Sequence, residues 1–469
     1  MKNSRCKTVT RFALTPLYLL LAGTAAQATD GYFANGYGMN AVGMGGAAVA
    51  VALEPFGGAV NPGAMSFLDS QWQVGLSWFS PDRSASRTGS GTPDGTPTGG
   101  WGIDGRATSG STNFFVPEFG VNWRHSPELS FGLTVYGNGG MNTDYPGGQI
   151  PAQSACAGFN PNPGPYNLLC GNGSLGVDLM QLMIAPYVSW QFTKGHSIGI
   201  APTLAYQRFE ANGLQAFDNP MLSTRPGSVT NNGYSDSWGG GVRIGYLGQF
   251  GDMVSVGAAY ATKMSMGEFD DYAGLFAQGG KFDIPSNFTI GAALRPTEQW
   301  LLALDFQRIY YSDSVAVSNR SSLIGACAGS PGGPGGVPPP AAPVPSACLG
   351  GSNGAGFGWQ DINVWKFGVQ YTLNSQWTLR GGYNYTQNPI QSQDVTFNIL
   401  APGVVKSQWT AGATWKLDAM SEITGAFMYA QSNSVTGSSL LVGFGAPPTT
   451  TETISMKEVQ LGIAYARKF

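Results

Sequence analysis

The last seventeen residues, from Thr453 to Phe469, constrain the fold of this chain more than any other stretch. They read TISMKEVQLGIAYARKF, in which apolar residues at positions 459, 461, 463 and 465 alternate with small or polar ones. Strict alternation predicts a β-strand with two different faces. Because the intervening residues are small or polar rather than charged, the pattern is typical of a strand with lipid on one face and a lumen on the other. The edge strand of a soluble sandwich is the alternative interpretation.

The first 28 residues have the pattern of a secretory signal peptide. Four basic residues surround the start of an apolar centre from Phe12 to Gly23, and Ala26-Gln27-Ala28 forms an A-x-A cleavage pattern. We therefore expect residues 1–28 to be removed on export. Taking four of the 24 basic residues away leaves 20 against 27 acidic residues, a net charge of −7. This charge excludes a nucleic-acid partner, which needs a basic face.

Composition also favours a membrane barrel over a soluble domain. Charged residues make up 11% of the chain, against roughly 25% in ordinary soluble domains. Glycine accounts for 69 residues and aromatic side chains for 12%, which suits small residues inside a barrel and aromatic ones at the membrane interface. After the leader, the sequence contains no apolar run long enough to predict a membrane-spanning helix.

Alternating runs bounded by turn residues predict an all-β fold, a 14-stranded antiparallel transmembrane β-barrel. Each run is near the roughly ten residues that a tilted strand needs to cross a bilayer. The predicted strands are 71–80, 113–124, 129–138, 177–192, 196–209, 238–249, 253–263, 284–295, 299–311, 362–372, 376–387, 405–417, 421–431 and 455–469. Prolines 117, 186 and 202 fall inside strands and predict local bulges or bends, because proline cannot donate a ladder hydrogen bond.

The predicted connections alternate between short turns and long loops. The seven long loops are 81–112, 139–176, 210–237, 264–283, 312–361, 388–404 and 432–454. Both termini then lie on the short-turn side, as expected for periplasmic turns and extracellular loops. We therefore expect residues 71–469 to form the barrel, with seven long extracellular loops.

The four cysteines after the leader lie in two of these loops. Cys156 and Cys170 share one loop, and Cys327 and Cys348 share another. Export makes disulfides possible, and pairing within each loop closes the shortest rings. Each such bond would remove about 3 kcal/mol of chain entropy from its loop. A metal site is not expected, because the two histidines lie beside short turns on the other side.

Residues 29–70 precede the first strand and do not alternate. The segment is rich in glycine and alanine and carries few charges, so it is too apolar for a free tail. A barrel of fourteen strands leaves a lumen too wide for side chains alone to fill. We therefore expect this segment to be an N-terminal hatch that plugs the barrel.

Short motifs in this segment resemble those of a known family. The runs Gly36-Tyr37-Gly38-Met39-Asn40, Gly43-Met44-Gly45-Gly46-Ala47 and Asn61-Pro62-Gly63-Ala64-Met65 resemble the hatch of the FadL/TodX family. These proteins are outer-membrane transporters of long-chain fatty acids and other hydrophobic compounds. The family has Asn-Pro-Ala before its first strand, so Gly63 is a departure. The run from Phe131 to Gly140 resembles the family's third strand, and Phe469 resembles the terminal residue that the barrel assembly machinery reads.

The resemblance implies passive transport of a hydrophobic solute through a hatch-closed barrel in the Gram-negative outer membrane. A ligand would be captured among the extracellular loops, bind above the hatch, and leave sideways at a kinked third strand. We place that kink at Gly137, Gly139 and Gly140, because glycine permits bulges, although a plain strand end is the alternative. The candidate ligand contacts are Phe33, Met39 and Met44 in the hatch and the inward-facing Arg243, Lys366 and Arg380.

Each candidate contact also has a structural interpretation. Any of the three cations could anchor a carboxylate or pair with other lumen charges, and the hatch side chains could pack the segment in place. A general porin and a structural or adhesive barrel are the alternative functions. We expect no enzyme activity, because a Ser–His device needs a histidine near the outer leaflet, and no cofactor. The expected partners are a hydrophobic small molecule, outer-membrane lipid and lipopolysaccharide, around a monomeric barrel.

Overall fold

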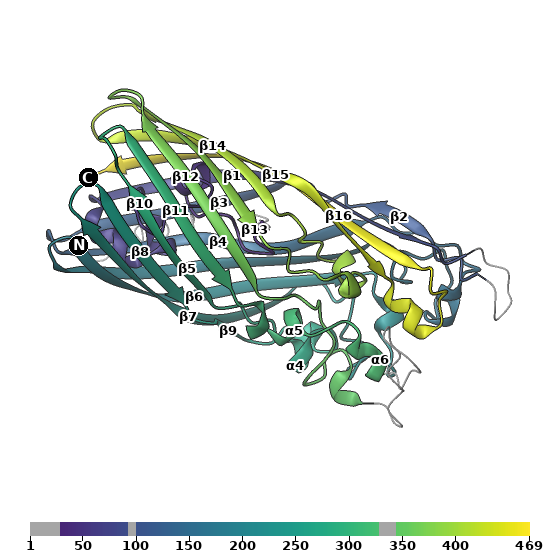
Figure 1. Ribbon diagram of the computed structural model, residues 1–469. Coiled ribbons are helices and arrows are strands. Elements are labelled where there is room, and N and C mark those ends of the chain that lie inside the picture. The colour runs from purple at the N-terminus through teal and green to yellow at the C-terminus, as the bar shows by residue number, and fades with distance from the viewer. Residues whose placement is uncertain (1–28, 92–99, 328–343) are drawn as a thin grey trace, which may run out of the picture.

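Fourteen antiparallel strands close into one barrel in the computed structural model, which describes residues 29–91, 100–327 and 344–469 (Figure 1). Each barrel strand pairs with the next, and the last pairs back with the first, from Gln71↔Lys468 to Thr88↔Thr451. The predicted 14-stranded barrel is therefore confirmed. The expected signal peptide, residues 1–28, lies outside the described residues.

All fourteen barrel strands overlap the ranges that alternation predicts. In chain order they are β1 (Gln71–Thr88), β3 (Phe114–Arg124), β4 (Leu129–Tyr145), β5 (Leu175–Thr193), β6 (His196–Asn212), β7 (Ser235–Phe250), β8 (Val254–Ala261), β10 (Asn287–Leu294), β11 (Trp300–Ile309), β12 (Ile362–Thr372), β13 (Trp377–Thr386), β14 (Ser407–Lys416), β15 (Ser421–Ser438) and β16 (Thr451–Lys468). Two further strands, β2 (Gly105–Thr108) and β9 (Ser265–Met266), pair with β1 and β7.

Several strands extend further into the long loops than the sequence predicts. β1, β15 and β16 each have 18 residues, whereas β8 and β10 have 8. The outward-facing side chains of these extensions are polar, so the extensions lack the apolar alternation of a lipid-facing strand. Their pairing with the neighbouring strands nevertheless continues. For example, the hydroxyls of Ser84 and Ser455 lie 2.8 Å apart across β1 and β16. The barrel is therefore taller where β16 and β2 project beyond the shorter strands (Figure 1).

The alternation of faces is present in the structure. In β13, Trp377, Leu379 and Tyr385 are exposed on the outer surface, whereas Thr378 and Asn384 are buried inside. A similar pattern along the other strands gives the barrel an apolar outer band, as a lipid-facing surface requires. Among the described residues, no helix has the length and apolar composition needed to cross a membrane.

Two of the three strand prolines lie in a gap of the ladder between β5 and β6, where the register does not shift, whereas the ladder of β1 and β3 continues past Pro117. Pairing stops at Ile184↔Leu204 and resumes at Val188↔Ile200, so Pro186 and Pro202 lie in the unpaired stretch. Neither proline has an N–H to donate, which explains why the ladder fails here.

The helices of the described residues are all short. The N-terminal segment, residues 29–70, contains α2 (Met39–Gly43), α3 (Gly57–Val60) and η1 (Pro62–Phe67). The loops contain η2 (Ala155–Gly158), η3 (Gln215–Phe217), η4 (Asp270–Tyr272), α4 (Ala277–Gly280), η5 (Tyr311–Asp313), α5 (Val315–Ser318), α6 (Leu323–Cys327), η6 (Pro345–Ala347), η7 (Ser392–Asp394), η8 (Phe397–Ile399) and η9 (Leu440–Phe444). Disulfides join Cys156 to Cys170 and Cys327 to Cys348, which confirms the pairing within each loop.

Candidate functional site

The N-terminal segment lies within the ring of strands (Figure 1). Its hydrogen bonds reach strands on every side of the barrel. Partners on the wall include Gln73 of β1, Asn122 of β3, Ser189 of β5, Tyr246 of β7, Ser255 of β8, Asp305 of β11, Lys366 of β12, Asn384 of β13 and Thr410 of β14. These contacts bind the segment to the wall around the barrel.

Asn61, the first residue of the predicted hatch motif, fixes one end of the segment. Its Nδ2 donates to the carbonyl oxygens of Val49 at 2.7 Å and Tyr246 at 2.8 Å, and its Oδ1 accepts from the Gly63 N–H at 3.0 Å. Pro62 begins η1 directly after it. A Cβ on Gly63 would lie 2.7 Å from the carbonyl oxygen of Gly245 on β7. The close approach of β7 therefore accounts for glycine at the third position of the motif.

The other end of the segment is held by charge and by one tyrosine. The carboxylate of Asp30 lies 3.6 Å from Lys366 Nζ and accepts from the side-chain amides of Asn384 and Gln408. The hydroxyl of Tyr311, at the start of η5, donates to the Asp30 carbonyl oxygen at 2.6 Å. The beginning of the segment is thus bound both to the wall and to a loop residue.

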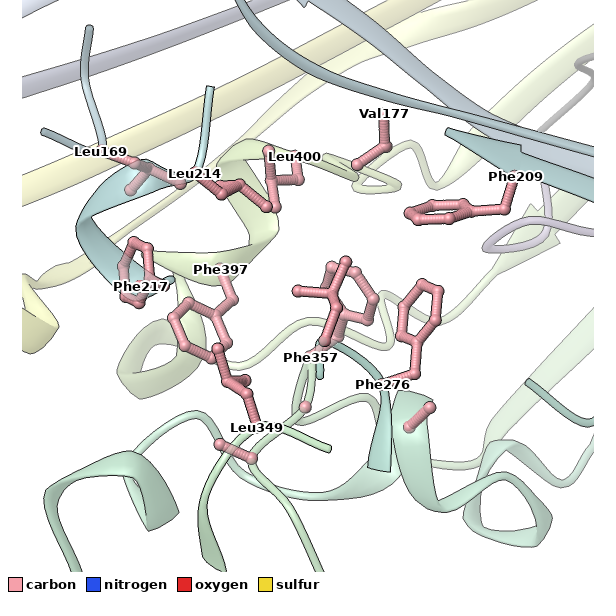
Figure 2. Close-up of a pocket in the computed structure, with 14 residues that line it drawn as sticks. Leu169, Val177, Phe209, Leu214, Phe217, Phe276, Leu349, Phe357, Phe397 and Leu400 are labelled. Atoms are coloured by element: carbon pink, nitrogen blue, oxygen red, sulfur yellow. The ribbon is translucent and has the colours of Figure 1, made fainter. Parts of the chain in front are cut away.

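An apolar cavity, the loop cavity, lies among the long loops (Figure 2). Val177 of β5, Phe209 of β6 and aromatic and leucine side chains from several loops point toward its centre. Its lining residues are Leu169, Val177, Phe209, Leu214, Phe217, Leu275, Phe276, Ala316, Leu349, Ala355, Gly356, Phe357, Phe397 and Leu400. None of them carries a charge, so the cavity suits an uncharged apolar ligand.

Two smaller cavities flank the loop cavity. The outer cavity shares Leu169 and Phe217 with it and is otherwise lined by Phe159, Cys170, Ala216, Leu222, Thr396, Leu440, Leu441 and Phe444. The inner cavity is lined by Gly31, Tyr32, Phe79, Arg83, Gly140, Met141, Asn142, Trp359, Ala401, Pro402, Gly403 and Met456. Leu400 lines the loop cavity and its neighbour Ala401 lines the inner one. The outer and loop cavities therefore share two lining residues, and the loop and inner cavities are lined by consecutive residues of one loop.

Loop residues between these cavities are held by one asparagine. The indole N–H of Trp359 donates to Asn398 Oδ1 at 2.5 Å, and Asn398 Nδ2 donates to the carbonyl oxygens of Phe357 and Asp394. Burial raises the pKa of the neighbouring Asp394, although hydrogen bonds from Ser321 oppose this shift. The loop that carries Leu400 and the loop that carries Trp359 are therefore joined by polar contacts outside the apolar cavity.

The barrel wall beside the inner cavity is irregular at β4. The register of β4 with β5 shifts between Gly137 and Gly139, which leaves Asn138 as an extra residue on β4. Among the described residues, the pairing of β4 with β3 ends at Phe119↔Val135, although β3 continues beside β1 to its first residue. The glycines named from the sequence thus flank a bulge, next to a stretch where β3 and β4 are not paired.

The bulge also contacts the N-terminal segment. The N–H of Ala34 donates to the Asn138 carbonyl oxygen at 3.0 Å, and the Tyr37 hydroxyl donates to Asn138 Oδ1 at 2.9 Å. Phe33 forms an isolated bridge with Gly139. The irregular part of the wall is therefore connected directly to the segment inside the barrel.

A fourth cavity, the polar cavity, lies between part of the N-terminal segment and side chains of β7, β10, β11 and β12. It is lined by Phe33, Ala34, Gly36, Tyr37, Gly46, Ala59, Val60, Arg243, Asn287, Thr289, Asp305, Gln307 and Lys366. Three residues predicted as ligand contacts, Phe33, Arg243 and Lys366, come together here. Arg243 Nη1 lies 3.4 Å from the Val60 carbonyl oxygen and 3.5 Å from Asn287 Oδ1, and the guanidinium also bonds the Tyr136 side chain.

The other three candidate contacts lie elsewhere. Met39 packs against β16, where a Cβ on Gly462 would lie 2.2 Å from its sulfur. Met44 packs against Gly368 of β12. Arg380 donates to side chains of β12 and β14. These residues contact the wall directly, and none of them lines the four cavities described above.

The sequence did not indicate the residues of the loop cavity or the role of Tyr311 and Trp359. These residues lie in loops, where no periodic pattern relates a side chain to a face. A concentration of aromatic residues in otherwise polar loops was the one available signal, as in Phe357-Gly358-Trp359.

Comparisons with known proteins agree with this architecture. The family described as "Outer membrane protein transport protein (OMPP1/FadL/TodX)" matches residues 166–443. A search of curated proteins gave no significant match. Among solved structures, the toluene transporter TodX of Pseudomonas putida is 18% identical, with a TM-score of 0.61 over 94% of this chain and 100% of that one. The toluene transporter TbuX of Ralstonia pickettii is 17% identical, with a TM-score of 0.58 over 93% and 99%. A FadL homologue of Pseudomonas aeruginosa is 14% identical, with a TM-score of 0.60 over 96% and 100%.

Proposed function

Because the chain belongs to the outer-membrane transport protein family (OMPP1/FadL/TodX), whose members carry hydrophobic compounds, we propose that it admits an uncharged hydrocarbon by passive diffusion. The family is one of transport channels rather than enzymes. The observation that carries the choice of ligand is the loop cavity, whose lining is apolar throughout. An apolar solute gains about 0.8 kcal/mol for each buried CH₂ group, whereas a carboxylate would lose its hydration there.

The proposed route follows the outer, loop and inner cavities. A ligand enters through the outer cavity, binds in the loop cavity and reaches the inner cavity past Leu400 and Ala401. The N-terminal segment acts as a hatch that closes the lumen beneath it. The inner cavity is lined by Gly140, Met141 and Asn142 of β4, directly after the bulge. Release is sideways, through the unpaired stretch between β3 and β4, so the ligand avoids the aqueous phase.

A long-chain fatty acid is the second candidate ligand. The polar cavity supports it, because Arg243 and Lys366 both line it and neither forms a close ion pair, Lys366 Nζ lying 3.6 Å from the Asp30 carboxylate. A carboxylate could bind between them as a charge-assisted pair. The general porin and the adhesive barrel have no comparable support, since neither would require a segment bound to the wall on every side.

The proposed surroundings of the barrel follow from the same features. Lipid covers the apolar outer band, and lipopolysaccharide surrounds the taller strands. The exposed Phe469 at the end of β16 is the residue for the barrel assembly machinery to bind. We propose a monomer, because the apolar band continues around the barrel.

Uptake of radiolabelled toluene and of a radiolabelled long-chain fatty acid by expressing cells tests the route. Leu400→Arg places a charge in the loop cavity, and we expect it to abolish toluene uptake. Met221→Arg places the same charge on an exposed loop residue outside the three cavities and serves as the control. Equal toluene uptake by both variants would contradict the route, and uptake of the fatty acid alone would favour the second ligand.

Deletion of Asn138 tests the sideways release. Removing this one residue restores a continuous register between β4 and β5. We expect the deletion to stop uptake while the barrel still folds, as judged by heat-modifiable gel mobility. Asn138→Ala, which keeps the extra residue, should retain uptake.

A chain lacking residues 29–69 tests the hatch, because it should leak small polar solutes that the intact chain excludes.

A further inference from the structure

Two buried charges on neighbouring strands face each other across the ladder but are not paired. Asp305 of β11 and Lys366 of β12 are direct cross-strand partners in the β11–β12 register. Side chains at such positions have their Cβ atoms about 5 Å apart and commonly form ion pairs when their charges are opposite. Asp305 is 0% exposed and Lys366 is 6% exposed, so both charges depend on protein partners.

Each of the two charges binds the N-terminal segment instead. Asp305 Oδ2 accepts from the N–H groups of Ala48 at 2.8 Å and Val49 at 2.9 Å. Lys366 Nζ donates to the Asn35 carbonyl oxygen at 2.8 Å and lies 3.6 Å from the Asp30 carboxylate. The remaining oxygen of Asp305, Oδ1, has no hydrogen-bond partner among the described residues.

The surroundings leave room for another arrangement. Both side chains line the polar cavity, which lies between the N-terminal segment and the wall beside these contacts. On the other side of Asp305, the cross-strand partner on β10 is Gly291, which has no side chain to offer. Lys366 is therefore the cation placed to reach Asp305 if the segment moves away.

We propose that Asp305 and Lys366 are positioning residues that exchange partners when the hatch moves. With the hatch seated, each holds a different part of it, and with the hatch displaced, they pair with each other. A buried charge left without a partner is strongly destabilising. The exchange removes that cost from the displaced state, so the hatch can be held firmly and still be released. This inference rests on the hatch of the proposed function.

A double-mutant cycle on amide hydrogen exchange tests the inference in the purified, folded barrel. The readout is the exchange rate of the Ala48 and Val49 amides, followed by mass spectrometry of the peptides that contain them. The four proteins are the wild type, Lys366→Met, Asp305→Asn and the double variant. Lys366→Met also removes a contact of the seated hatch, so its effect alone does not decide the question.

The coupling between the two positions decides it. Lys366→Met changes the exchange rate by a certain factor, which is measured once with Asp305 present and once with Asn at position 305. If the displaced state contains the pair, Lys366→Met destabilises that state only when Asp305 is present. The factor is then roughly tenfold smaller in the wild-type background than in the Asp305→Asn background. Equal factors in the two backgrounds would overturn the inference, because a merely structural lysine acts independently of the side chain at position 305. Lys457→Met, which removes an exposed lysine on the outer surface, should leave the rate unchanged. A similar change in that control would also overturn the inference.

The exchange measurement is independent of transport. If coupling is found but neither toluene nor fatty acid is taken up, the partner exchange stands and the proposed cargo is wrong. If uptake occurs without coupling, the proposed function stands and the partner exchange is wrong. Where Lys366→Met fails to fold, Lys366→Gln serves in the same cycle.

Discussion

Replacing Glu452 should loosen the loops around the outer cavity without opening the barrel. Glu452 of β16 is paired with Arg87 of β1, with Arg87 Nε 2.8 Å from Glu452 Oε1, and both side chains are 0% exposed. The same carboxylate accepts from the hydroxyls of Ser439, at 2.9 Å, and Thr396. Arg87 also donates to the Ile103 carbonyl oxygen. One ion pair thus joins three different loops above the membrane.

The expected magnitude follows from burial. Glu452→Ala leaves the Arg87 guanidinium buried without a counter-charge, which costs about 3–5 kcal/mol. If the cost falls on local opening of these loops, amide exchange in them becomes at least about a hundredfold faster, since roughly 1.4 kcal/mol corresponds to a factor of ten. The Leu440 amide, which donates to Thr396 Oγ1 at 2.8 Å, is a direct reporter.

Hydrogen exchange of the purified barrel measures this effect. The matched control is the double variant Arg87→Met with Glu452→Leu, in which apolar side chains replace the whole pair and most of the loss should be recovered. Exchange in the strand cores should stay unchanged in both. If Glu452→Ala leaves the Leu440 amide as protected as in the wild type, the assumption that this ion pair holds the loops together is wrong.

Three further predictions concern the ends of the N-terminal segment and a loop. Gly31→Ala places a Cβ 2.0 Å from the Tyr311 hydroxyl at a φ of +71°. The Tyr32 N–H donates to this hydroxyl, so the Tyr32 amide should exchange faster in the variant. Unchanged exchange would contradict the contact between Tyr311 and the segment. Asn61→Ala removes three hydrogen bonds worth about 1 kcal/mol each. Liposome-swelling assays should then show that small sugars enter through the variant. A permeability to sugars as low as that of the wild type would contradict the anchoring by Asn61. Serine at both Cys327 and Cys348 removes a constraint of roughly 3 kcal/mol. Proteases should then cut that loop faster, with barrel mobility on gels unchanged.

The barrel could be predicted from the sequence because each strand shows its own alternation of apolar and polar residues. A strand with lipid outside and a lumen inside must alternate with period two, so every predicted strand could be recognised without knowing its neighbours. The alternation also placed Arg243, Lys366 and Arg380 inside correctly. The alternation did not predict the loop-side ends of β1 and β15. Both faces of these strands are polar above the membrane, so the apolar alternation ends there although the strand pairing continues.

The site was less predictable because its contacts are distant in the sequence. Asp30 meets Lys366 across 336 positions, and no local pattern indicates such a pair. The sequence pointed to the glycines of β4 as the place of a kink, and the extra residue of the bulge there is Asn138, which lies between two of them. Its side chain reaches Tyr37, and the sequence offered no sign of this link.

The interior of the barrel separates two kinds of contact, and this separation bears on the cargo. The N-terminal segment is held by charged and polar groups, as where Glu54 accepts from Gln73 Nε2 at 2.8 Å and from the Ala41 N–H at 3.0 Å. The loop cavity is lined by apolar groups alone. An uncharged ligand in that cavity therefore does not compete with the anchors of the segment. A carboxylate that reached Lys366 would compete directly with Asp30, so a fatty acid would displace the segment where a hydrocarbon would leave it seated. The two candidate cargoes thus differ in whether exchange at residues 30–35 rises when the ligand is added, and the same measurement identifies the ligand class.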